Sequence, residues 1–461
     1  METLPEVGTT LQLAAFVANV GYEDIPENVL SKARALMLDA VGCSLAGWAA
    51  QEIEQVIRLG RELGTASTST IIGSAEPTSL LGATIINGYL TTGITACDVY
   101  TPLHFHATPE VIPVCLALAE EVHATGKELM TAVVVGLEVA CRIARSLDSA
   151  EFRQRGWHSP GVVGPMGAAA AAAKLLNLDA KGVRRAIALA FSQASGTLAS
   201  WPTTAVKFHQ ARGAGAGLMS GLLACEEFEA SAEPLEAPDG GLYASYAPGE
   251  GAKVIENLGS DWELLNISLR RWPGATPIQA LLTALLTYDQ GPLPTQDQIK
   301  TVAIHVPPRT QKAHESSEIP TTTFEALLSF HFVAASVLEK GYFWIDLVAP
   351  DRLGSKETRN FVAEKVRLVA DESVPIGGVA VYMETIDGKK IEIRQDAALG
   401  TPINPLSDVH LHEKFLKGAS GRLSPEAAER LLESLIEPDR YVDSAEITAL
   451  MRPETEKENL T

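Results

Sequence analysis

Two histidines, one residue apart, precede an apolar helical run in "PLHFHATPEVIPV" (102–114). On a β-strand, an H-x-H pair points both imidazoles the same way, as zinc sites often require. No third or fourth ligand follows at a recognisable spacing, and a second such pair, His410 and His412, has no matching partner. We therefore predict no metal site, and we consider His104 and His106 either as loop histidines or as acid/base groups.

The position of His106 beside a predicted helix N-terminus favours a functional role. Thr108 is a candidate N-cap and Pro109 a candidate first helical residue. The dipole at a helix N-terminus favours anions. Asp98, eight residues before His106, could supply a base or orient the imidazole, and is otherwise an ordinary loop aspartate.

The same arrangement occurs twice more along the chain. In "GWHSPGVVGPMGAAAAAAKLL", His158 precedes a small-residue helix that Ser159 could cap. In "VKFHQARGAGAG", Lys207 and His209 stand at the entry to another such helix. Three helix N-termini, each with a cation or potential cation, are what an acidic protein needs in order to bind carboxylates. Three glycines of the first helix would allow close approach of a ligand or serve helix packing alone: Gly161, Gly164 and Gly167.

The glycines of "GAGAG" (213–217) do not indicate a nucleotide site. No apolar strand precedes them, and their spacing is not G-x-G-x-x-G. We therefore predict no dinucleotide cofactor.

Composition and charge narrow the class of protein. The 461 residues carry 37 Lys and Arg against 57 Asp and Glu, a net charge of −20, with no basic cluster. Nucleic acid and anionic membranes are therefore poor partners. The five cysteines are dispersed and form no C-x-x-C motif, and neither a signal peptide nor an apolar run of membrane-spanning length is recognisable. We predict a cytoplasmic globular protein.

The hydrophobic pattern predicts a mainly α fold. Helical periodicity dominates residues 1–267, whereas "TVAIHVPP" (301–308) and "VAVYMETIDGKKIEIR" (379–394) alternate with period two, the latter around an Asp-Gly hairpin signal. One long helix is expected between them, at about 324–340, and helical patterns return after residue 405. We predict a large all-helical domain built from both chain ends (1–267 and 406–461), with a smaller α+β domain (268–405) inserted as a lid.

Six segments of the chain together resemble the MmgE/PrpD family. They run in order from about residue 10 to 440: "RALMLDAVGCSLAG", "IINGYL", "HATPEVIPVCLALAE", "GWHSPGVVGPMGAAAAAAKLLNLD", "VKFHQARGAGAG" and "TTFEALLSFHFVAASVLEKG". The family includes 2-methylcitrate dehydratase, cis-aconitate decarboxylase and iminodisuccinate epimerase. The resemblance implies a helical domain with an inserted lid, a cleft between them, a homodimer, and no metal or organic cofactor.

The resemblance also implies an active site. His106, His158 and Lys207 match positions that line the site in the family's decarboxylases. Asp98 matches the later aspartate of an Asp-rich motif, and Val99 or Tyr100 stands where a Thr or Ser is usual.

Two lid positions depart from the family pattern. Gln279 stands where the family has a histidine, and His314 where the decarboxylases have a tyrosine. Because glutamine cannot exchange a proton at neutral pH, any acid or base step at that position is lost or moved, with His314 as a candidate replacement.

We expect a cofactor-independent lyase, a dehydratase or decarboxylase, acting on a di- or tricarboxylate of the citrate or aconitate type. His158 and His106 would be general acid and base, tuned by Asp98 or His314. Lys207 would hold carboxylates and stabilise an enediolate-like charge, and the other substrate contacts would come from His209, Ser159, Gln279 and Tyr100. Two alternatives stay open: a cofactor-free isomerase, epimerase or cyclase on a different substrate, and a catalytically silent protein on the same fold.

Overall fold

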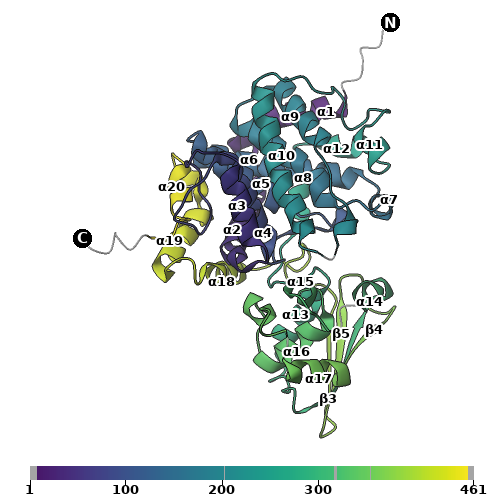
Figure 1. Ribbon diagram of the computed structural model, residues 1–461. Helices are drawn as coiled ribbons and strands as arrows, with labels where there is room; N and C mark the ends of the chain where they lie inside the picture. The colour runs from purple at the N-terminus through teal and green to yellow at the C-terminus, as the bar shows by residue number, and fades with distance from the viewer. Residues whose placement is uncertain (1–7, 202, 316–318, 354, 455–461) are drawn as a thin grey trace, which may run out of the picture. The chain divides into compact units, whose positions relative to one another are not determined.

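The computed structural model describes residues 8–201, 203–315, 319–353 and 355–454. Its chain forms two compact units (Figure 1). The first comprises the described parts of Met1–Gly93, Cys97–Ile267 and Leu411–Thr461, and the second comprises Ile94–Ala96 and Ser268–His410. The first is built of helices and the second mixes helices with a sheet, which confirms the predicted mainly α fold class with a smaller α+β part.

The helical unit takes its elements from both ends of the chain. Its α-helices are α1 (Thr9–Asn19), α2 (Glu27–Ala46), α3 (Ile53–Glu62), α4 (Leu80–Gly93), α5 (Thr108–Glu121), α6 (Gly126–Ser146), α7 (Ser149–Gln154), α8 (Ser159–Leu175), α9 (Ala180–Ser192), α10 (Ala205–Cys225), α11 (Leu242–Ser245), α12 (Ala252–Ile255), α18 (Asp408–Ala419, from Leu411 on), α19 (Pro425–Ile436) and α20 (Ala445–Ala449). The short strand β1 (Val99–Tyr100) belongs to this unit and pairs with β2 (Ile267–Ser268), whose second residue is assigned to the other unit.

Small residues let the central helices of this unit approach closely. Helices α4, α5, α8 and α10 pack on one another (Figure 1). A Cβ atom added at Gly217 of α10 would lie 2.3 Å from the Cβ of Ala168 in α8, and one added at Gly167 of α8 would lie 2.6 Å from the Gly136 carbonyl of α6. The glycines and alanines of these helices are therefore packing residues.

The two ends of the chain meet at the crossing of α2 and α18. The Lys414 ammonium lies 2.5 Å from the Asp39 carboxylate, and both side chains are almost wholly buried. A Cβ added at Gly418 would lie 2.4 Å from the carbonyl of Gly42, so these helices are in backbone contact. A buried ion pair thus joins residues 375 positions apart.

The α+β unit contains a four-stranded sheet of order β4-β3-β5-β6. Strand β3 (Ile299–Val306) runs parallel to β4 (Val366–Ala370) and antiparallel to β5 (Val379–Thr385), which pairs with β6 (Lys390–Gln395). The hairpin predicted around Asp387-Gly388 is confirmed, with Gly388 at a φ of 88°. The helices of this unit are α13 (Ile278–Leu286), α14 (Pro308–His314), α15 (Thr323–Ala326), α16 (Phe330–Lys340) and α17 (Lys356–Lys365).

The single long helix predicted at about 324–340 is wrong, because the chain breaks into α15 and α16. Ser329 causes the break: its backbone is extended, and its hydroxyl accepts a hydrogen bond from the Phe332 N–H as the N-cap of α16. Periodicity alone spans such a break, since the apolar spacing continues through it.

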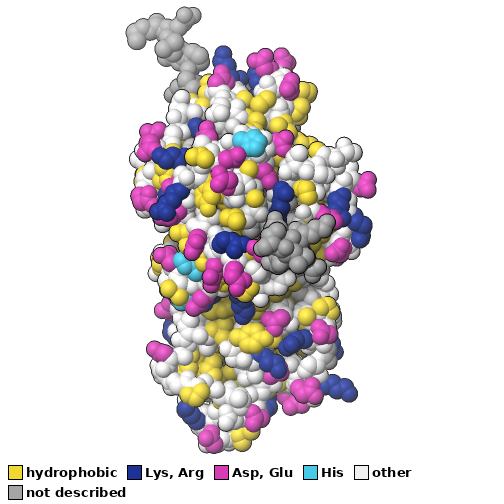
Figure 2. Space-filling model, turned by 90° about the vertical axis from the view of Figure 1, so that its left-hand side faces the viewer, with side chains coloured by type: hydrophobic (Ala, Val, Ile, Leu, Met, Phe, Trp, Pro, Cys, Tyr) yellow, Lys and Arg dark blue, Asp and Glu magenta, His cyan; other side chains and the backbone are white. Residues whose placement is uncertain are grey.

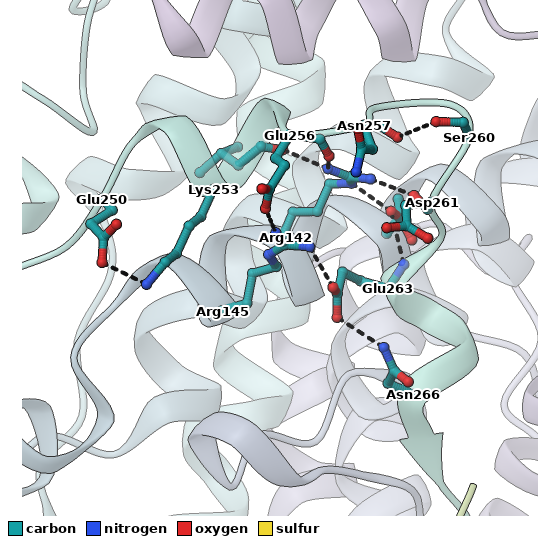
Figure 3. Close-up of polar contacts among 12 residues, drawn as sticks. Arg142, Arg145, Glu250, Lys253, Glu256, Asn257, Ser260, Asp261, Glu263 and Asn266 are labelled. Atoms are coloured by element: carbon teal, nitrogen blue, oxygen red, sulfur yellow. Dashed lines mark hydrogen bonds and ion pairs between the residues drawn. The ribbon is translucent and has the colours of Figure 1, made fainter.

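Arg142 of α6 fixes the segment between α12 and β2 onto that helix (Figure 3). Arg142 and Glu138 of α6 pair with both side chains fully buried. The Arg142 guanidinium also donates to the carbonyls of Val254, Glu256 and Asp261, while the Glu138 carboxylate accepts from backbone N–H groups of residues 263 and 264. This network therefore gives hydrogen-bond partners to backbone carbonyl and N–H groups of a loop that forms no β-sheet of its own.

The surface of the molecule carries mixed charge. On the face shown in Figure 2, Asp and Glu side chains are interspersed with Lys and Arg. Among the residues that the structure describes, no helix combines the length and the apolar character needed to cross a bilayer.

Candidate active site

His106 lies half-buried at the end of a tight turn before α5. Tyr100 and Phe105 exchange backbone hydrogen bonds, and His104 reverses the chain between them in the left-handed conformation, with φ of 50°. The Nδ1 atom of His106 lies 2.6 Å from the backbone carbonyl of Asp98. A carbonyl can only accept, so the neutral imidazole carries its proton on Nδ1 and its lone pair on Nε2. The turn therefore presents Nε2 as the basic nitrogen.

Asp98 acts on both His106 and α5, but with different atoms. Its carbonyl orients the imidazole, whereas its buried carboxylate accepts hydrogen bonds from the N–H groups of Ala107 and Thr108 and from the Thr108 hydroxyl. The predicted cap was wrong, because Ala107 is the N-cap and Thr108 the first helical residue. Asp98, nine residues upstream, already fills the anion position at this N-terminus.

His158 and His209 form an imidazole pair. Their Nδ1 atoms lie 3.0 Å apart and their ring centroids 5.1 Å apart. Burial, the neighbouring His209 and Arg153 lower the pKa of His158 to about 3, and burial and Arg212 lower the pKa of His209. The pair is therefore uncharged at neutral pH, with one proton shared between the two Nδ1 atoms.

Ser159 does not cap α8 as predicted. His158 occupies the N-cap position, and Ser159 is the first helical residue. Its hydroxyl donates instead to the carbonyl of His104, at 3.0 Å. The serine thus fastens the turn that carries His106 to the helix that begins beside His158.

The lowered pKa of His158 makes the stability of the folded protein pH-dependent. In the unfolded chain a histidine titrates near pH 6.5, so below that pH the unfolded state binds more protons than the folded state. Stability should be fully present above about pH 6.5 and should decline as the pH falls toward about 3.

A His158→Gln variant should therefore lose less stability than the parent between about pH 7 and pH 5, as measured by urea unfolding midpoints. Replacement of the exposed His104 by asparagine serves as the control. An unchanged acid sensitivity in His158→Gln would contradict the assignment of a neutral buried imidazole.

Lys207 occupies a helix C-terminus as well as the first turn of α10. Its ammonium donates to the carbonyls of Thr92 (2.9 Å) and Gly93 (2.7 Å), the last residues of α4. A cation is favourable there because the helix dipole is negative at that end. The side chain is 5% exposed, so a fixed positive charge lies inside the unit at the start of α10.

Tyr100, which the sequence suggested as a substrate contact, is buried and hydrogen-bonded within the helical unit. Its side chain is buried, and its hydroxyl donates to Glu263 at 2.7 Å. Burial raises the pKa of the phenol, so it stays protonated. The Glu263 carboxylate is in turn paired with Arg145 (Figure 3), which makes Tyr100 part of a structural network.

Gln279 and His314 belong to the α+β unit. The Gln279 amide donates to the carbonyls of Trp272 (3.0 Å) and Gly274 (3.3 Å), so it stabilises the turn before α13. The Nδ1 atom of His314 lies 2.8 Å from the Leu328 carbonyl, and its ring packs edge-on against Phe330. Burial lowers the pKa of His314.

Two ionisable residues of the helical unit were missed by the sequence analysis: the half-buried Arg212 and the buried Glu110. Arg212 of α10 donates to the carbonyls of Gly161, Gln193 and Ser195, and thereby ties the start of α8 to the loop before α10. Glu110 lies in the first turn of α5 and is fully buried. A glutamate inside the apolar run of "TPEVIPVCLALA" was the available signal, because ionisable residues seldom occupy a buried helix face.

Three of the site histidines, His106, His158 and His209, thus lie with Asp98 in the helical unit, around the starts of α5, α8 and α10, whereas His314 belongs to the α+β unit. Within the described residues, no three His, Cys, Asp or Glu side chains are arranged to hold a metal ion. The glycines that the sequence left open are packed against protein: a Cβ on Gly161 would meet the Ser195 carbonyl at 2.2 Å, and one on Gly164 the Glu110 side chain at 2.5 Å.

Comparison with known proteins covers almost the whole chain. The MmgE/PrpD N-terminal domain matches residues 11–254, and the MmgE/PrpD C-terminal domain matches residues 275–437. A cis-aconitate decarboxylase-like protein of Aspergillus oryzae is 26% identical over 478 residues, covering 98% of this chain and 99% of the relative. Human cis-aconitate decarboxylase is 26% identical over 466 residues, covering 96% and 94% respectively. Because both family domains match in order and together span most of its length, this chain belongs to the MmgE/PrpD family.

Proposed function

We propose that this protein is a cofactor-independent lyase that removes CO2 or water from a citrate- or aconitate-type carboxylate, with decarboxylation as the favoured reaction. The observation that carries the proposal is the near full-length similarity to two proteins named as a cis-aconitate decarboxylase or one like it. The imidazoles and buried lysine gathered in the helical unit supply chemistry that suits such a reaction. That the enzyme is a cytoplasmic homodimer stays a prediction.

Loss of CO2 from an unsaturated tricarboxylate leaves a carbanion whose charge spreads onto a neighbouring carboxylate. Such a reaction needs positive charge near that carboxylate and an acid that protonates the carbon. In our proposal Lys207 supplies the fixed positive charge. The N-terminus of α8, which has no side-chain cap, would bind a second carboxylate.

The histidines divide the proton chemistry between them. His106 offers the Nε2 atom of an imidazole whose other nitrogen is held by a carbonyl, so it is oriented to exchange a proton with substrate. The His158–His209 pair is neutral, so it acts first as a base or as an N–H donor and needs a proton before it can serve as an acid.

A second candidate is a cofactor-free isomerase or epimerase. It is favoured by Gln279, whose amide is engaged with the Trp272–Gly274 turn and cannot exchange a proton. A reaction that only moves a proton within the substrate needs fewer acid/base groups than dehydration does.

The experiment is proton NMR in D2O with citrate, 2-methylcitrate, cis-aconitate, longer alkylcitrates and iminodisuccinate. The wild-type protein should form a decarboxylated or unsaturated product that a Lys207→Ala variant does not form. Deuterium exchange into the substrate without net loss would replace the lyase by the isomerase. No change in any substrate would overturn the assignment to citrate-type compounds.

A further inference from the structure

Glu110 is a buried carboxyl group that the proposed chemistry does not yet use. It is the third residue of α5, four positions after His106, and its side chain is fully buried. Neither of its carboxyl oxygens has a hydrogen-bond partner among the residues that the structure describes. A glutamate at this position often reaches back to its own helix N-terminus, but Asp98 already accepts the hydrogen bonds there. Its carboxyl group is therefore turned elsewhere.

The fold provides a slot for this carboxyl group between α8 and α10. A Cβ on Gly164 of α8 would lie 2.5–2.7 Å from the Cγ, Cδ and Oε1 atoms of Glu110, and a Cβ on Gly213 of α10 would lie 3.2 Å from its Cγ. Gly164 comes six residues after His158 and Gly213 four residues after His209, or roughly 9 Å and 6 Å along their helices. Glu110 thus lies one to two helical turns below all three histidines.

The surroundings of the slot favour the protonated acid. Burial and the nearby Asp98 carboxylate raise the pKa of Glu110 well above its usual value, and its own backbone N–H and then Arg212 act in the opposite direction. Glycines of α8 and α10 line the slot and carry no charge. The charged groups that act on Glu110 are Asp98, which precedes α5, and Arg212 of α10. An unpaired buried carboxylate is far less favourable than an unpaired buried carboxylic acid.

Arg212 links this acid to the histidine pair. Its guanidinium donates to the Gly161 and Ser195 carbonyls, and a Cβ added at Gly161 would lie 3.2 Å from the Cβ of His209. Its positive charge lowers the pKa of His209. If Glu110 became a carboxylate, it would offset that charge and make protonation of the pair more favourable.

We propose that Glu110 is a proton-holding, positioning residue of the site, whose loss of a proton is coupled, through the charge of Arg212, to the uptake of a proton by the His158–His209 pair. This inference deepens the proposed lyase function and rests on it. In the resting protein the proton is on the Glu110 carboxyl group and the pair is neutral. During the reaction the carboxyl group loses that proton and the pair gains one, so that an imidazolium becomes available to protonate the carbanion. The net charge of the buried region does not change.

The first test needs no substrate. Infrared spectra of the wild-type protein near neutral pH should show the carbonyl stretch of a protonated carboxylic acid, and a Glu110→Gln variant should lack it. In protein with 15N-labelled histidine, the His158 and His209 resonances should shift in an alkaline step that coincides with the loss of this band. That step should be absent from Glu110→Gln. Glu121→Gln, which removes an exposed carboxyl group from the same helix, is the matched control.

The second test uses whichever substrate the NMR panel identifies. Glu110→Gln keeps the size and neutrality of the side chain but cannot give up a proton, so kcat should fall about 10²-fold with KM unchanged. A variant with full kcat overturns the proposal, as does a wild-type protein without the protonated-acid band or without the coupled histidine step. If no substrate reacts, the proposed function falls, while the infrared and 15N measurements still decide whether the protonation of Glu110 is coupled to that of the pair.

Discussion

Replacement of His106 by asparagine should reduce turnover of the proposed carboxylate substrate by about 10²–10⁴-fold while the fold stays intact. The amide nitrogen of asparagine can take the place of Nδ1 and keep the hydrogen bond to the Asp98 carbonyl, now 2.6 Å long. Nothing in asparagine replaces Nε2, the nitrogen that would exchange the proton. The rate of product formation by NMR and the circular dichroism spectrum together measure the two effects.

His104→Asn is the matched control for this variant. The side chain of His104 is exposed, and asparagine tolerates the left-handed conformation that this residue adopts. This control should retain wild-type activity. If both variants were equally active, His106 would have no role in the reaction, and the two imidazoles would be loop residues.

Arg142→Ala should reduce the free energy of unfolding of the helical unit by about 3–5 kcal/mol. Both members of the Arg142–Glu138 pair are completely buried, so removal of the guanidinium leaves an uncompensated carboxylate inside the unit. The carbonyls of Val254, Glu256 and Asp261 lose their donor at the same time (Figure 3). Denaturant unfolding followed by helical circular dichroism measures the change.

The chain offers a closely matched comparison for this variant. Arg155 pairs with Glu151 at the same i,i+4 spacing, but both side chains are 37% exposed. Arg155→Ala should cost less than about 1 kcal/mol, because water solvates the groups that remain. Equal losses of unfolding free energy in the two variants would show that burial does not determine how much the Arg142–Glu138 pair stabilises the protein.

The sequence predicted the fold class and the approximate starts of α5, α8 and α10, because periodicity and runs of small residues are local properties of the chain. It placed His106, His158 and Lys207 near helix starts, and the structure confirms these positions at α5, α8 and α10. Their catalytic roles stay predictions. Local patterns also misled: Thr108 and Ser159 are residue types that often cap helices, yet each is the first residue of its helix. The Asp98 carboxylate accepts the hydrogen bond of the Thr108 N–H, and no side chain caps α8.

Long-range partners were what the sequence could not supply. Tyr100 is next to the site residues in sequence, but its hydroxyl bonds to a glutamate 163 residues away. The pairing of His209 with His158, 51 residues away, was not predicted, and the substrate contact expected of His209 stays a prediction. Only the folded chain shows that Arg212 and Glu110 act on each other electrostatically, because no spacing rule connects residues of separate helices.

The pairing of Asp39 with Lys414 sets a condition on biosynthesis. Asp39 emerges from the ribosome early, whereas its buried counter-ion is added 375 residues later, after the whole α+β segment has been translated. At typical elongation rates of about 5–20 residues per second, that interval lasts roughly 20–80 s. During it the nascent α2 lacks Lys414 and the α18 surface that pack against it in the finished protein, so this part of the helical unit is completed only late in translation.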